Sequence, residues 1–289
     1  MMTLMSDVMQ ARMADLVKRR PHAIGLYGSL GSGKHTVARE LAAQLLGVSS
    51  DALSGYPYFY DVIPAKKDII TVEELRELLG QMKMTVPGAH ETRRIVLIAD
   101  ADKVLRSDAQ NVLLKFIEEP PAGTCIILTY ADETAMLPTI RSRVQAVSLV
   151  LPLRDELTAY FTEQGHESTA IARAYALSGG LPGMMSALLA SDQAHPLLGA
   201  VAEAKKILAA DTFQRLTMID ALAKSDLDSL FFAFRQIART SLSSAAEKGQ
   251  SDAVLRRWTQ VLQLSQQAET WRSGHVQNKL LLTNFMLQL

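Results

Sequence analysis

The first half of the chain alternates short, largely apolar runs with longer segments of helical periodicity. The strand-like runs cover Ile24–Tyr27, Tyr58–Ile63, Ile95–Ala99 and Cys125–Thr129. Their length and their β-branched and aromatic content are typical of strands. Uninterrupted apolar runs are in addition typical of parallel strands that are covered on both faces. These runs predict a buried parallel sheet.

Helical segments separate the strands and carry recognisable ends. They cover residues 1–20, 34–46, 71–82 and 107–118. Gly47 follows the second segment and Pro120 follows the fourth, and both residue types stop helices. Thr71 and Glu74 match a capping box, which marks the start of a helix. The alternation of strands and helices predicts an α/β domain with a parallel sheet at residues 1–150.

Beyond about Val150 the strand-like runs disappear, and Ala- and Leu-rich helical patterns continue along the chain. The clearest interruption is Ser178–Gly183, which is rich in glycine and contains a proline. The pattern predicts a small helical domain at 151–192 and an all-helical domain at 193–289. Helices of the last domain are expected at 201–210, 213–223, 227–246, 253–271 and 279–289.

The composition of the chain argues against several classes of protein. The 289-residue chain balances 30 Lys and Arg with 30 Asp and Glu, which argues against binding nucleic acid through bulk charge. The single cysteine, Cys125, excludes an intrachain disulfide and a cysteine-rich zinc site. No apolar run is long enough to cross a membrane, and Asp7, Arg12 and Asp15 interrupt the apolar N-terminus. We expect a cytoplasmic protein without membrane association.

Residues 28–36 match the phosphate-binding pattern G-x-x-x-x-G-K between a predicted strand and a predicted helix. In such loops the backbone N–H groups cradle phosphates, the lysine reaches the β- and γ-phosphates, and a following Ser or Thr holds Mg²⁺. Here His35 takes the Ser/Thr position and Thr36 comes one residue late. The alternative is a tight turn that binds nothing. The predicted binding residues are Gly28, Gly31, Ser32, Gly33, Lys34, His35 and Thr36.

A second motif of nucleotide sites is an apolar strand that ends in Asp-Glu, where the Asp holds Mg²⁺ and the Glu polarises water. Here the strand ends in Ala99, Asp100 and Ala101. In one register Ala99 replaces the metal ligand and Asp100 the glutamate. In the other register Asp100 is the metal ligand and Ala101 replaces the glutamate. Either register lacks one acid, so we predict slow hydrolysis and assign no metal ligands.

A third segment, Leu137–Arg143, ends in two arginines on either side of Ser142. Taken alone, such a segment is more typical of a solvated turn than of a functional site. Its position after the two motifs above makes it a candidate for a functional role.

Together these motifs resemble those of bacterial sliding-clamp loaders, which are AAA+ proteins, and most of all the delta-prime type of subunit of the DNA polymerase III clamp loader. The resemblance covers nearly the whole chain and is most specific over residues 98–143. It rests on Pro21–Ala23, residues 28–36, Ile98–Lys103, Ala109–Pro121, Leu137–Arg143 and Asn278–Leu282, in this order.

The resemblance implies an AAA+ nucleotide-binding-type domain at 1–150, a helical lid at 151–192 and a helical collar for oligomerisation at 193–289. Such a subunit works in a hetero-oligomer with gamma/tau and delta subunits, as part of the DNA polymerase III holoenzyme. The complex loads the sliding clamp onto primer–template DNA. These proteins are the partners that the resemblance implies for this chain.

The resemblance also implies roles for single residues. Arg143 matches an arginine finger that is supplied in trans to a neighbouring ATPase subunit, although Val144 replaces the usual Cys. Thr129 matches the polar residue that such proteins place at a strand end beside the phosphates. Gly180–Met184 lacks the arginine of active members, and residues 37–94 lack the four zinc-binding cysteines of many relatives. No zinc module is therefore expected.

The sequence thus predicts a replication subunit whose own site is degenerate. It binds ATP or ADP weakly or stays empty, is poorly equipped for Mg²⁺, and is not an efficient ATPase alone. The first alternative is an active gamma/tau-type ATPase, which the changes at His35 and Ala99 disfavour. The others are an interaction protein that keeps only the fold, and a P-loop kinase of a small molecule. The kinase is least favoured, because nothing in residues 150–289 resembles a substrate lid.

Overall fold

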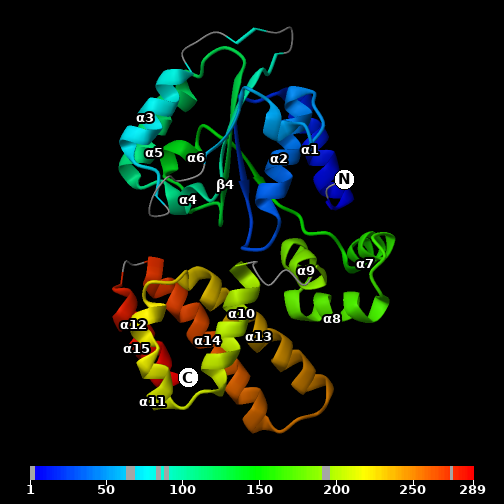
Figure 1. The fold of residues 1–289 in the computed structure, drawn as a ribbon, viewed down its shortest axis with the longest axis vertical. Helices are drawn as coiled ribbons and strands as arrows, with labels where there is room; N and C mark the ends of the chain where they lie inside the picture. Colours follow the sequence, from blue (N-terminus) through cyan, green and yellow to red (C-terminus); the bar gives the residue numbers. More distant parts are fainter. Residues whose placement is uncertain (1–3, 63–68, 83–85, 88–90, 191–195, 274–275) are drawn as a thin grey trace. The chain divides into compact units, whose positions relative to one another are not determined.

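The computed structural model describes residues 4–62, 69–82, 86–87, 91–190, 196–273 and 276–289. The chain divides into two compact units, Met1–Leu153 and Arg154–Leu289 (Figure 1). The predicted boundary between residues 192 and 193 lies outside the described residues, as does Ile63 at the end of a predicted strand. The division into three domains therefore stays a prediction.

Among the described residues of the first unit, five parallel strands form a sheet in the order β2-β3-β4-β1-β5. This arrangement confirms the predicted α/β fold with a parallel sheet. The strands are β1 Ala23–Tyr27, β2 Phe59–Val62, β3 Arg94–Ile98, β4 Thr124–Tyr130 and β5 Gln145–Ser148. The sequence pattern does not predict β5, because this short edge strand is only partly buried and lacks an apolar run.

Helices cover both faces of this sheet. They are α1 Asp7–Arg19, α2 Lys34–Leu46, α3 Val72–Gln81, α4 Ala101–Val104, α5 Ser107–Glu118 and α6 Pro138–Arg141, with a 3₁₀ turn η1 at Leu53–Gly55. Figure 1 shows α1 and α2 on one side and α3, α4 and α5 on the other. Successive strand residues point to opposite faces, so Leu97 packs with α2 and Ile98 packs with α3 and α5. The central strands are therefore held rigidly between two apolar cores.

Local chemistry sets the ends of these helices. The bounds of α2 and α5 agree with the predicted ones. The predicted capping box is confirmed, since the Glu74 N–H donates to the Thr71 hydroxyl and the Thr71 N–H donates to the Glu74 carboxylate. The helix predicted for 1–20 begins later, after Ser6, whose side chain caps α1. Predicted and observed elements of this unit thus agree closely where punctuating residues are present.

The second unit is helical, as predicted. Its helices are α7 Arg154–Glu163, α8 Ser168–Ser178, α9 Pro182–Leu189, α10 Pro196–Ala209, α11 Thr212–Thr217, α12 Ile219–Leu222, α13 Leu227–Glu247, α14 Asp252–Ser273 and α15 Asn278–Gln288. The helix predicted for 213–223 is divided at Met218, whose N–H bonds the Arg215 carbonyl three residues back. Phe231, Phe234 and Phe285 pack ring against ring in the core.

Among the described helices, none combines the length and the apolar character needed to cross a bilayer.

Candidate phosphate-binding site

The carboxyl ends of three neighbouring strands bring the predicted site residues together. The glycine-rich loop follows β1, Asp100 follows β3, and Thr129 lies near the end of β4. Because β1, β4 and β3 are adjacent and parallel, their carboxyl ends lie at one edge of the sheet. Ligands of open parallel sheets bind at this edge.

Glycines shape the loop for two different reasons. Gly31 and Gly33 have φ values of 77° and 85°, a left-handed backbone that glycine adopts without strain. Gly33 precedes the first residue of α2 and has open space where a Cβ would lie. At Gly28 a Cβ would come within 3.2 Å of the Ser32 hydroxyl oxygen. The loop is thus close-packed at its start and open at the N-terminus of α2.

Ser32 places a hydroxyl inside this loop. The residue is only 6% exposed, and its Oγ has no hydrogen-bond partner among the described residues. A buried polar atom without a partner costs free energy unless something else satisfies it. A bound anion at the loop would provide an acceptor for this hydroxyl.

Lys34 folds back across the loop. Its side chain is 8% exposed, and its Nζ lies 3.3 Å from the Ser29 carbonyl oxygen and 3.6 Å from Asp100 Oδ1. Burial lowers the pKa of Lys34, and the carboxylates of Asp100 and Asp102 oppose this effect only in part. Lys34 is therefore a largely desolvated amine group that lies between the Ser29 carbonyl and Asp100 at the loop.

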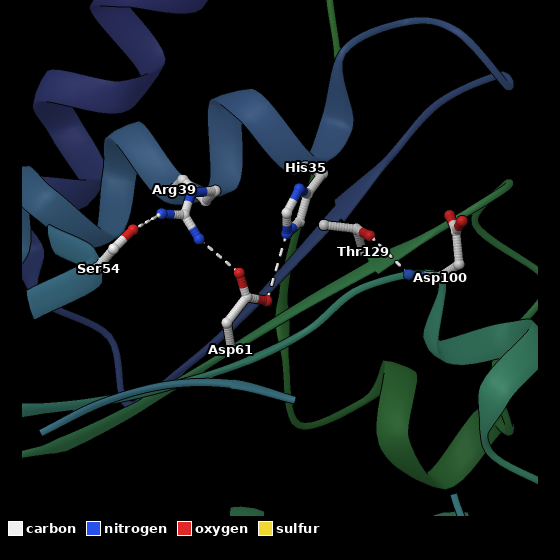
Figure 2. Close-up of polar contacts among 6 residues, drawn as sticks. All are labelled: His35, Arg39, Ser54, Asp61, Asp100 and Thr129. Atoms are coloured by element: carbon white, nitrogen blue, oxygen red, sulfur yellow. Dashed lines mark hydrogen bonds and ion pairs between the residues drawn. The ribbon is translucent and has the colours of Figure 1, made fainter. Parts of the chain in front are cut away.

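Asp100 is fixed by its backbone. Its left-handed conformation (φ 46°, ψ 48°) turns the chain from β3 into α4, and its N–H donates to the Thr129 hydroxyl at 2.9 Å (Figure 2). Thr129 itself is buried. Asp100 is thus an acid beside the loop, and this contact is compatible with both registers of the motif.

His35, which takes the position of the usual metal ligand in the motif, is paired with an acid on β2. Its Nε2 lies 3.3 Å from Asp61 Oδ1 on β2, and Arg39, one turn later in α2, bonds the other carboxylate oxygen of Asp61 (Figure 2). Arg39 also donates to the Ser54 hydroxyl at 2.7 Å. Burial alone would raise the pKa of Asp61, but His35 and Arg39 outweigh it and lower the pKa. Thr36 is exposed on the first turn of α2.

Arg143 contacts residues of α5 and α6. Its Nε lies 2.7 Å from Glu118 Oε1 at the end of α5, and its Nη1 donates to the Thr139 carbonyl at 3.1 Å. The side chain is 41% exposed. Within the described part of the chain, the ion pair and hydrogen bonds of Arg143 join it to Glu118, Thr139 and Ser142, and none joins it to loop residues 28–36. The structure therefore brings the loop, Asp100 and Thr129 together but leaves Arg143 apart from them.

Sequence reasoning misses three acids. Asp61 and Glu118 are the partners of His35 and Arg143, and both contacts join segments that no local pattern relates. Asp102 accepts the Ala131 N–H at 3.3 Å, and burial raises its pKa. Its place in the segment Ile98–Lys103, which carries the resemblance, is a sequence signal that could have indicated it.

The residues present fit a phosphate better than they fit Mg²⁺. The loop offers backbone N–H groups, the Ser32 hydroxyl and the Lys34 ammonium group, all of which bind anions. Mg²⁺ requires oxygen ligands in an octahedral arrangement. His35 offers nitrogen instead, and the described residues contain no cluster of three or more acids, histidines or cysteines that could hold a metal.

A parallel sheet whose first strand ends in such a loop at a helix N-terminus defines a P-loop nucleotide-binding type of domain. The sequence model of the family described as DNA polymerase III, delta subunit, matches residues 7–152, just over half of the chain. The chain belongs to this family. The resemblance to delta-prime-type subunits is thereby confirmed.

The relatives of this chain include replication proteins of several bacteria. DNA polymerase III subunit delta' of Pseudomonas aeruginosa is 30% identical over 178 residues, 56% of this chain and 53% of the relative. The delta' subunit of Escherichia coli K12 is 31% identical over 141 residues, 47% and 41% of the two chains. Subunit gamma of Buchnera aphidicola is 33% identical over 135 residues, which are 42% of this chain and 36% of the relative. The chain spans about half the length of the delta' relatives it matches.

Two solved structures from Thermotoga maritima have a broadly similar fold. A DNA polymerase III gamma-subunit-related protein has a TM-score of 0.49 at 18% identity, covering 97% of this chain and 98% of that chain. A RuvB variant has a TM-score of 0.47 at 16% identity, covering 85% and 80%. Scores this low carry no functional argument, so family membership rests on the sequence.

Proposed function

We propose that this chain is a delta-prime-type subunit of the DNA polymerase III clamp loader and helps load the sliding clamp onto primed DNA. It assembles in the cytoplasm with gamma/tau and delta subunits as a hetero-oligomer. Family membership and the delta' relatives support this proposal. The observation that carries its mechanism is the exposed guanidinium group of Arg143, which is separate from the chain's own loop.

In this proposal Arg143 serves a nucleotide that is bound by a neighbouring subunit. A guanidinium group is a planar, permanent cation that can donate two parallel hydrogen bonds to phosphate oxygens. Beside a γ-phosphate it stabilises the charge that develops during phosphoryl transfer. Glu118 holds the side chain in place within this chain until a phosphate replaces the carboxylate.

The chain's own loop, on this account, binds ATP or ADP weakly and hydrolyses it slowly. In either register one acid of the strand-end motif is missing, at Ala99 or at Ala101, and His35 has no hydroxyl for a metal. The alternative function is an active gamma/tau-type ATPase, which the similarity to a gamma subunit favours. ATP turnover by the isolated full chain separates the two. A rate of roughly 1 s⁻¹ or more, within the ordinary range of enzymes, would favour the ATPase.

Reconstitution tests the proposed function itself. Clamp loading onto primed DNA is measured with gamma/tau subunits, delta subunit and sliding clamp from the same organism, with and without this chain. We expect the chain to co-elute with the complex and to be required for loading. Full loading in its absence, or no co-elution with gamma/tau or delta subunits, would contradict the proposal and leave an interaction protein outside replication.

A further inference from the structure

The loop contains a complete set of anion donors that does not depend on a metal. The N-terminus of α2 presents free N–H groups, and its dipole favours negative charge. The buried Ser32 hydroxyl has no partner among the described residues and lies against Gly28 inside the loop. Lys34 adds a desolvated cation. Backbone, hydroxyl and ammonium donors are therefore present within one loop.

His35, at the sequence position of the usual metal ligand, belongs to a group of three interacting side chains. We call His35, Arg39 and Asp61 the Asp61 array. The side chains of His35 and Arg39, both on α2, point toward Asp61 on β2. Each of them contacts a different oxygen of the Asp61 carboxylate (Figure 2). A carboxylate whose two oxygens already accept hydrogen bonds, one of them from a permanent cation, is a poor ligand for a further cation.

The remaining acid beside the loop is also engaged. Asp100 Oδ1 lies 3.6 Å from Lys34 Nζ, and the backbone of Asp100 is fixed by Thr129. Mg²⁺ at this edge would have to displace Lys34 from Asp100 while gaining no hydroxyl ligand from position 35. The imidazole of His35 does not compensate, because Mg²⁺ prefers oxygen over nitrogen ligands.

We infer that the loop binds the phosphates of a nucleoside diphosphate or triphosphate without Mg²⁺, and that the Asp61 array occupies the place of the magnesium ligand. This inference rests on the phosphate-binding part of the proposed function and specifies the form of the ligand. The nucleotide would then act as a structural ligand of the α2 N-terminus, since hydrolysis by such sites needs the metal.

Calorimetric titration of the full chain with ADP and with ATP tests the inference, in buffer with MgCl₂ and in buffer with EDTA. Four proteins are compared: the wild type, His35→Thr, His35→Ala and Lys34→Ala. His35→Thr restores the missing hydroxyl. His35→Ala is its matched control, because it removes the imidazole without offering an oxygen ligand. Circular dichroism verifies that each variant is folded.

We expect the wild type to bind at least as tightly in EDTA as in MgCl₂, and Lys34→Ala to bind far more weakly in both. His35→Thr should bind about tenfold more tightly with Mg²⁺ than without it, a difference of about 1.4 kcal/mol, whereas His35→Ala should show no magnesium effect. Wild-type binding that weakens tenfold or more in EDTA would overturn the inference. So would equal magnesium effects in the two His35 variants.

Absence of wild-type binding in both buffers would also overturn it. That result would contradict nucleotide binding by the loop. It would not contradict the proposed role of Arg143 in a neighbouring site, because clamp loading by the reconstituted complex is measured separately. Failure of the inference and failure of the proposed function are therefore distinguishable.

Discussion

Arg143 is tied to its own chain by an exposed ion pair. Its Nε lies 2.7 Å from Glu118 Oε1, and both side chains are about two-fifths exposed. Pairs of this kind stabilise a fold by roughly 0–1 kcal/mol, because water screens the two charges. A phosphate of a neighbouring subunit would therefore replace Glu118 at small cost to the fold.

The strength of this pair is testable with Glu118→Gln, which removes the charge and keeps the shape of the side chain. We expect the free energy of unfolding, measured by urea denaturation, to change by less than about 1 kcal/mol. Glu119→Gln, at the next position, is the matched control. A loss of about 3 kcal/mol or more, typical of a broken buried pair, would mean that Arg143 is held too firmly to leave Glu118.

Asp61 makes a pH-dependent contribution to stability. Burial favours its neutral form, but His35 and Arg39 favour the carboxylate more strongly and lower its pKa. The carboxylate therefore stabilises the folded chain above about pH 4, the ordinary pKa of Asp. This contribution is lost as the pH falls through the lowered pKa of the folded state.

Comparison of the wild type with Asp61→Asn isolates this contribution. We expect the difference between their free energies of unfolding to be largest above about pH 5 and to shrink below about pH 3. Urea denaturation at a series of pH values measures it, and carboxylates elsewhere titrate equally in both proteins. A difference that grows as the pH falls would show that Asp61 is not held by His35 and Arg39.

At the level of elements, β1 and β4 meet where there is no room for a side chain. A Cβ on Gly25 would lie 2.3 Å from the Tyr130 hydroxyl oxygen and 2.8 Å from ring carbon Cε1. Tyr130 is fully buried, stacks on Tyr27, and its hydroxyl has no partner among the described residues. Gly25 thus lets an aromatic ring from the end of β4 pack against the backbone of β1.

This packing predicts a compensating pair of substitutions. Gly25→Ala overpacks the core and should lower the free energy of unfolding by about 1–3 kcal/mol. Tyr130→Phe alone should be nearly neutral, because the lost hydroxyl has no partner to leave unsatisfied. In the double variant, Tyr130→Phe should recover part of the loss, since the nearest clashing atom is gone. Strict additivity in denaturant unfolding would rule out the contact.

The helices that the sequence predicts most accurately are those with clear stops. α2 ends before Gly47, which adopts a left-handed conformation, and α5 ends just before Pro120. By contrast, β5 has no apolar run, because an edge strand needs little burial. The break at Met218 between α11 and α12 occurs where the Met218 N–H bonds the carbonyl three residues back. The spacing of apolar residues does not indicate such a local change of hydrogen bonding.

The candidate site is predictable only as far as its parts are local in sequence. The loop, Asp100 and Thr129 follow from motifs at strand ends, and parallel topology brings them together. Asp61 and Glu118 lie 26 and 25 positions from the residues they contact, His35 and Arg143. Such pairings depend on how β2 and α5 lie in the folded unit, which no local pattern specifies.

At the scale of the whole molecule, the fold and the chemistry of the site can be considered separately. The family match covers residues 7–152 and so falls within the first unit, whose sheet positions the glycine-rich loop. Two nucleotide-site motifs differ from their usual form, at His35 and at Ala99 or Ala101, while an exposed arginine lies at position 143. We therefore expect this chain to contribute to ATP hydrolysis mainly through a neighbouring subunit.

The most direct test is the ATPase rate of the reconstituted complex, stimulated by primed DNA and the sliding clamp. The complex is assembled with wild-type chain, with Arg143→Ala, or with Arg19→Ala, a control that removes another exposed, ion-paired arginine. An arginine finger contributes about 10³–10⁵ in kcat at the site it serves, so that site should fall nearly silent. The account predicts a severalfold lower stimulated rate with Arg143→Ala and a wild-type rate with Arg19→Ala. A wild-type rate with Arg143→Ala, in a complex shown to be intact, would contradict it.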